Sequence, residues 1–200
     1  MTAVPVQETR MFDGSDTVVL YDELAFQDVL PLAWRTLPHA VDGDAVAGIM
    51  ERNAKVLHAR EALDQLGPVE KPDENSPNSA DLMRLELKIN LLLDLVGQVL
   101  AASRPRPPEV PVRFNAQGVV WRSAAPLPEA GAQGIAEIYL HDALAEPLRL
   151  PGRVSNVTPD GHVKVRFAPV TETVADLMEK LCFRRHRRQI AGTRHPRRGA

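Results

Sequence analysis

Hydrophobic residues follow two different periods along this chain, and the change lies near residue 104. Before it, apolar side chains recur at steps of three and four, as on one face of an α-helix; after it, they alternate in short runs, as in β-strands. We therefore predict an α+β fold. Long helices form a coiled coil or helical bundle for oligomerisation, and a small antiparallel β-barrel with a C-terminal helix follows them.

Two long helices are predicted over residues 42–103, and we expect this segment to assemble copies of the chain. The first begins at Asp42 or Asp44, either of which can cap a helix, and it ends before Gly67. A linker over 67–79, rich in Pro, Asn and Ser, has nothing to bury. It separates the first helix from the second.

The second helix, over 80–102, has an apolar seam with the a/d spacing of a coiled coil. The residues of this seam are Leu82, Leu85, Ile89, Leu92, Val96 and Val99. Further leucines widen the apolar stripe beyond what a two-stranded pairing covers. We predict a homo-oligomer, with a tetramer favoured. The alternative is that the first helix covers much of this stripe within one chain.

Residues 1–41 are predicted to form an N-terminal arm. Its first part is polar, residues 17–21 have the composition of a short strand, and residues 24–34 are apolar but interrupted by Pro31. We therefore expect the later part of the arm to be packed and partly irregular.

Residues 104–192 are predicted to form the barrel and its C-terminal helix. The expected strands are 110–114, 119–122, 135–140, 148–157 and 162–167. Asp160-Gly161 indicates a hairpin between the last two strands. A helix follows from Thr171 to about Ala191, and residues 193–200 form a basic tail.

Charge is distributed unevenly, although the formal net charge is only -2. Residues 1–80 carry fourteen acidic and six basic side chains, whereas 181–200 carry seven arginines and no acid. The arginines that stand out are Arg184, Arg185, Arg187 and Arg188. They can complement the dipole at a solvated helix end, or they can form a surface for an anion or a partner protein.

Residues for catalysis or metal binding do not gather in the sequence. The six histidines are scattered, and the single cysteine, Cys182, lies in an apolar helix where a buried hydrophobic role is expected. We predict no catalytic residue, no metal and no cofactor. Residues 1–10 lack the pattern of a signal peptide and no apolar run is long enough to span a membrane, so a cytoplasmic protein is expected.

Several segments, in their order, resemble the PilZ domain, a small bacterial β-barrel associated with cyclic di-GMP. They are VRFNAQGVVW (112–121) and PLRLPGRVSNVTPDGHVKVRF (147–167), followed by a C-terminal helix. FQDVLPLAW (26–34), LELKINLLLDLVGQVL (85–100) and FRRHRR (183–188) are similar to the atypical, tetramer-forming PilZ proteins. This resemblance implies four chains assembled through the heptad helix.

The ligand motifs depart from those of PilZ domains that bind cyclic di-GMP, which carry RxxxR and D/N-x-S-x-x-G. Two arginines precede the barrel, but the positions four residues after them are Pro and Val. Alignment on the motif's glycine leaves only that glycine in place. The candidate ligand residues are Arg104, Arg106, Arg113, Asn115 and Gly118. Because charge-assisted contacts to phosphate are lost, we expect weak or absent nucleotide binding.

The leading hypothesis is a non-enzymatic adaptor in cyclic di-GMP-linked signalling that acts on an unknown protein partner. A true cyclic di-GMP receptor is the second hypothesis. A nucleic-acid-binding protein that uses the basic C-terminal end is the third, and the net charge of -2 disfavours it. An unrecognised enzyme is the most distant reading.

Overall fold

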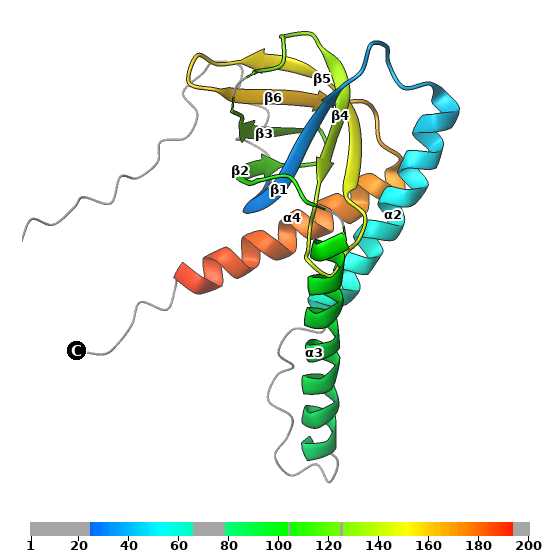
Figure 1. The fold of residues 1–200 in the computed structure, drawn as a ribbon, viewed down its shortest axis with the longest axis vertical. Helices are drawn as coiled ribbons and strands as arrows, with labels where there is room; N and C mark the ends of the chain where they lie inside the picture. The colour runs from blue at the N-terminus through cyan, green and yellow to red at the C-terminus, as the bar shows by residue number, and fades with distance from the viewer. Residues whose placement is uncertain (1–24, 66–78, 104, 125, 194–200) are drawn as a thin grey trace, which may run out of the picture.

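A computed structural model describes residues 25–65, 79–103, 105–124 and 126–193, in which six antiparallel strands close into a barrel (Figure 1). The strands are β1 (Phe26–Thr36), β2 (Glu109–Phe114), β3 (Gly118–Arg122), β4 (Gln133–Ile138), β5 (Leu148–Val157) and β6 (His162–Phe167). Their order around the barrel is β1-β2-β3-β6-β5-β4. The predicted small antiparallel barrel is therefore confirmed.

The predicted packed, partly irregular arm is corrected over residues 26–36, which do pack into the core but form a regular strand that closes the barrel. The first half of β1 pairs with β2 and the second half pairs with β4. Pro31 lies where β1 changes partner, opposite Glu109 at the end of its pairing with β2. A proline at such a switch costs the sheet little, because it interrupts neither ladder in its middle. The strand predicted at 17–21 lies outside the described residues.

Aliphatic and aromatic side chains fill the barrel. Those fully buried include Phe26, Phe114, Val119, Ile138, Leu148, Leu150, Val154, Val163 and Val165. The rings of Phe26 and Phe114 pack with centroids 4.9 Å apart, across the seam between β1 and β2. Helix α4 (Glu172–Thr193) covers one end of this core with the predicted inner face, Val174, Leu177, Met178 and Leu181.

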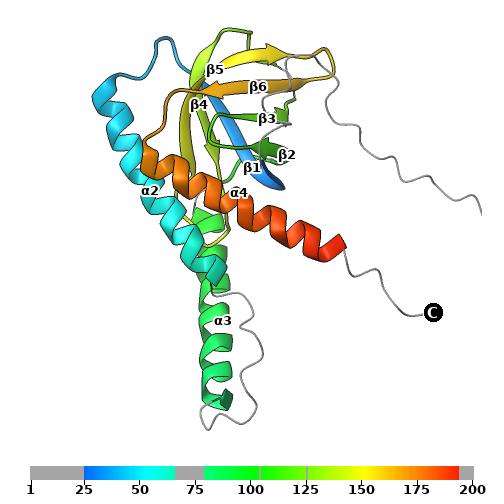
Figure 2. The same ribbon diagram turned by 180° about the vertical axis from the view of Figure 1, so that it is seen from behind.

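Helix α2 (Gly43–Gln65) packs against α4 and β5 of its own chain (Figures 1 and 2). Asp42 caps it, because its Oδ1 accepts a hydrogen bond from the Ala45 amide at 2.7 Å. Asn53 is 1% exposed; its amide donates to the Arg149 carbonyl at 2.6 Å and accepts from the Arg149 amide at 2.9 Å. The side chain thereby supplies hydrogen-bond partners to the backbone of β5 at a position where β5 does not pair with β6. Helix α2 is therefore fixed to the barrel.

Helix α3 (Ser79–Ser103) projects away from the barrel in both views (Figures 1 and 2). Its C-terminal part touches the body at Gly97, which is buried and lies beside Asp142 of the β4–β5 loop. The two helices of the predicted segment 42–103 thus differ: α2 buries its apolar face within the chain, whereas α3 leaves most of its own exposed.

Candidate functional site

Arg106 leads from α3 into β2, and its guanidinium is held by the β4–β5 loop. It pairs with the Asp142 carboxylate at 2.6 Å and donates to the carbonyls of Asp142 at 2.7 Å and Leu144 at 3.0 Å. It also lies over the Tyr139 ring, 5.4 Å from its centroid, and its side chain is only 14% exposed. Arg106 is therefore a structural anchor between α3 and the barrel. Arg104 lies outside the described residues.

Asn115 and Gly118 build the tight turn between β2 and β3. The Asn115 side chain is 4% exposed, and its Oδ1 accepts hydrogen bonds from the amides of Gln117 at 2.9 Å and Gly118 at 3.1 Å. A Cβ at Gly118 would lie 2.5 Å from the Val165 carbonyl oxygen, so only glycine fits. These two residues serve the turn itself.

The candidate ligand residues are not all brought together. Arg106 precedes β2 and Asn115 follows it, so they lie near opposite ends of a six-residue strand. At about 3.3 Å per residue, that strand separates them by roughly 20 Å. Arg113 lies between them on β2, where it pairs with Val120 of β3 and Gln27 of β1 in the ladder. Arg106 and Asn115 therefore do not form one anion-binding cluster.

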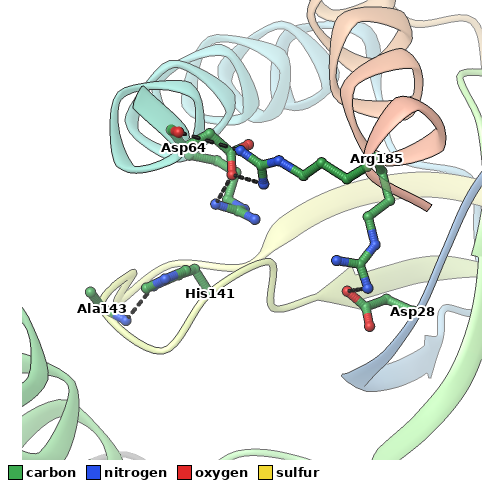
Figure 3. A network of polar contacts seen from close by, with 7 residues as sticks. Asp28, Asp64, His141, Ala143 and Arg185 are labelled. Carbon is green, nitrogen blue, oxygen red and sulfur yellow. Dashed lines mark hydrogen bonds and ion pairs between the residues drawn. The ribbon is translucent and has the colours of Figure 1, made fainter. Parts of the chain in front are cut away.

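The arginines of α4 face acidic residues of the same chain. Arg185 pairs with Asp28 of β1 at 2.8 Å (Figure 3), and Arg188 pairs with Asp64 of α2 at 2.9 Å. Arg184 pairs with Glu61 of α2. These contacts differ from both interpretations of the sequence, a solvated helix end and an open docking surface. The signal that could have found them is the excess of acid in the N-terminal part of the chain.

Arg187 differs from its neighbours on α4, because it is exposed and lies over the exposed ring of Phe183, 5.8 Å from its centroid. The other three arginines connect α4 to α2 and β1, so most of the charge of this cluster is used inside the fold.

Two titratable groups near these elements have shifted pKa values. Burial, followed by the charge of Arg60, lowers the pKa of His141, whose Nδ1 accepts a hydrogen bond from the Ala143 amide at 3.0 Å (Figure 3). Burial raises the pKa of the Cys182 thiol to about 11, and its Sγ donates to the Phe114 carbonyl at 3.7 Å. Cys182 is therefore protonated at neutral pH and is poorly suited to act as a nucleophile.

No group of three or more His, Cys, Asp or Glu is placed to hold a metal ion within the described ranges. In the same ranges, none of the helices combines the length and the apolar character that crossing a membrane requires.

The predicted seam of α3 is largely open to solvent in the single chain. Leu85 is 54% exposed, Leu92 61% and Val99 67%. Val96 is also exposed, Ile89 is half-buried, and the side chain of Leu82 lies outside what the structure describes. A second stripe, Leu87, Leu91 and Leu95, is exposed as well. Such a continuous apolar surface on a projecting helix is typical of an interaction face.

Sequence reasoning missed two features that depend on residues far apart. One is the contact of Asn53 with β5. The other is a cavity on the outer face of the barrel that both Arg153 and Arg166 line. The signal for the second was an arginine at an outward position of each of two strands that were predicted to pair.

The comparisons with known proteins agree with this architecture. Residues 57–195 match the family model described as the atypical PilZ domain, a cyclic di-GMP receptor. No curated protein matches the chain. Among solved structures, a pathogenic protein from Xanthomonas campestris is 25% identical, with a TM-score of 0.67 over 88% of this chain and 95% of that chain. It is described as a new tetrameric PilZ domain self-assembled via an unusual helical bundle.

The family match covers more than half of the chain, and it includes α3, all of the barrel except β1, and α4. The barrel, the helix that precedes β2 and the C-terminal helix were the segments that suggested this family. The chain belongs to the atypical PilZ domain family.

Proposed function

We propose that this protein is a non-enzymatic adaptor in cyclic di-GMP-linked signalling of the bacterial cytoplasm. It assembles through α3 as a coiled coil or helical bundle, with four chains favoured, and acts on a partner protein. The observation that carries the proposal is the exposed apolar surface of α3, which has both the heptad seam and a second leucine stripe.

Four helices explain the width of that surface better than two. In a dimer, the seam would be covered while Leu87, Leu91 and Leu95 stayed in water. In a four-helix bundle, each helix packs against two neighbours, so the buried surface extends beyond the seam to flanking positions such as Leu95. The solved relative from Xanthomonas campestris is described as assembling through a helical bundle, which supports the same arrangement here.

Weak or absent nucleotide binding is the second part of the proposal. Arg106 is engaged by the β4–β5 loop, so it can contact a phosphate only by giving up existing bonds, and Asn115 is buried in its own turn. A hydrogen bond to a charged group contributes roughly 1.5–3 kcal/mol to stability. The loss of the existing bonds would offset much of what a new contact with phosphate contributes.

A genuine cyclic di-GMP receptor is the alternative, and the description of the family model favours it. Nucleic-acid binding has less support, because Arg184, Arg185 and Arg188 already pair with acids of the chain.

Calorimetric titration of cyclic di-GMP into protein of measured mass separates the adaptor from the receptor. The adaptor predicts no binding, or a Kd well above the micromolar range. A submicromolar Kd would support the receptor, and Arg113→Ala would then weaken it. Lys164→Gln, a charge change on another strand, is the matched control.

A further inference from the structure

A cavity of about 360 Å³ lies on the outer face of the barrel, at the size typical of small-molecule sites. One wall is the segment 37–46, which leads from β1 into α2, and the other is formed by β4, β5 and β6. Most of its lining is apolar and includes Leu37, Val41, Val46, Pro151 and Phe167.

The walls of this cavity are fixed by backbone hydrogen bonds. The Leu37 amide donates to the Gln133 carbonyl at 2.8 Å, and the Ala168 amide donates to the Pro151 carbonyl at 2.8 Å. The Val46 amide, in the first turn of α2, donates to the Asp42 carbonyl at 2.9 Å. The cavity is therefore formed before any ligand arrives.

Two arginines of the cavity lie directly opposite each other across the β5–β6 pair. Arg153 and Arg166 are Cα partners in the ladder, and both are exposed. Like charges in this position destabilise a sheet, because directly opposite side chains share one face. Arg153 donates from Nε to the Gly131 carbonyl at 2.9 Å, but neither guanidinium has a carboxylate partner within the described parts of the chain. The lining contains no acidic side chain.

We propose that this cavity binds an organic oxyanion with an apolar body. The carboxylate or phosphate group accepts hydrogen bonds from Arg153 and Arg166, whose planar guanidinium groups suit such oxyanions. The apolar body lies against Val41, Val46 and Phe167. Binding relieves the repulsion of the arginine pair and covers apolar surface at the same time. Neither α3 nor the candidate nucleotide residues line this cavity, so the inference goes beyond the proposed function and does not rest on it.

Four probes that share parts of this chemistry test the proposal. The full chain is titrated by calorimetry with decanoate, decyl phosphate, decanol and inorganic phosphate, each below the concentration at which it self-associates. We expect saturable binding of decanoate or decyl phosphate, and the tighter of the two identifies the anionic group. Decanol lacks the charge and inorganic phosphate lacks the apolar body, so each should bind at least about tenfold more weakly.

Variants of single lining residues distinguish this cavity from the apolar face of α3. Arg166→Gln should weaken binding at least about tenfold and leave the melting temperature unchanged or higher, because the like-charge pair is gone. His39→Glu places a negative charge in the cavity at an exposed position and should also weaken binding. Lys164→Gln removes a charge from β6 outside the cavity and should keep the affinity.

Three results would overturn the proposal. They are the absence of saturable binding by either decyl anion, equal binding of decanol, and an affinity that Arg166→Gln and His39→Glu both leave unchanged. A decyl anion that binds the two variants as it binds the parent protein lies elsewhere, for example on α3.

Discussion

Buried polar side chains carry much of the specificity of this fold. Asn53 replaces a missing strand partner for Arg149, Asn115 closes the β2–β3 turn, and the Cys182 thiol donates to a carbonyl of β2. The contacts of Asn53 and Cys182 are not visible in local sequence patterns, because their partners lie 96 and 68 residues away in the sequence. The chemistry of the residue nevertheless predicts what its loss does.

Asn53→Ala should destabilise the protein strongly. It leaves the part-buried amide and carbonyl of Arg149 without their partner, at about 1–3 kcal/mol for each group. Urea unfolding of the variant measures this loss. Lys55→Ala, two residues along the same helix and exposed, is the control and should change the free energy of unfolding by less than about 0.5 kcal/mol. Equal effects of the two substitutions would show that Asn53 does not fix α2 to β5.

Cys182 should make stability fall as pH rises through the alkaline range. Its pKa is about 11 in the folded protein and 9.0 ordinarily, so between these values the folded state retains a proton that the unfolded chain loses. The stabilisation is complete below about pH 9, decreases by about 1.4 kcal/mol for each pH unit above it, and is lost by about pH 11. Urea unfolding at pH 8 and pH 10 measures it. Cys182→Ala should remove this part of the pH dependence; an identical slope in the variant would refute the assignment.

The elements themselves were predictable where local signals are strong. Alternating apolar residues and Asp160-Gly161 placed β5, β6 and their hairpin correctly, and the prolines after α3 marked its end. Strand β1 was missed because its evidence lies in β2 and β4, which come more than seventy residues later in the chain. Helix α2 was predicted, but its packing against α4 and β5 was not, since the signals that mark a helix do not say which surface covers it.

The ion pairs between α4 and α2 should contribute little individually and should weaken with salt. Arg184→Ala/Arg188→Ala removes contacts to Glu61 and Asp64, but Asp64 keeps Arg60 at 2.7 Å. Partly exposed pairs of this kind contribute about 0–1 kcal/mol each after solvent screening. Melting temperatures at low and high ionic strength measure the effect, with Arg187→Ala as the control. A loss that is the same at both salt concentrations would mean that packing, not charge, is responsible.

At the scale of the whole molecule, the barrel, α2 and α4 form one body and α3 projects from it (Figure 2). The order of the segments was enough to identify the family from the sequence. The ligand residues were not predictable in the same way, because their availability depends on contacts such as Arg106 with Asp142, 36 residues away. The leucine face of α3 could be predicted from periodicity, whereas the protein partner on which the assembly acts could not.

Leu85→Glu/Leu92→Glu should dissociate the assembly without unfolding the barrel. Both side chains are exposed in the single chain, so the charges cost nothing until a second helix packs against them. Burying an unpaired carboxylate at a helix interface is then strongly unfavourable. Sedimentation velocity measures the change. Asn90→Glu, which adds a charge to α3 outside both apolar stripes, is the control and should leave the assembly intact.

The mass of the full chain in solution tests the central claim most directly. Light scattering coupled to gel filtration, at micromolar concentration, should give four times the chain mass of 22.0 kDa. This result is expected because assembly around α3 removes its exposed apolar seam from water. A mass equal to that of one chain across the micromolar range would contradict the account.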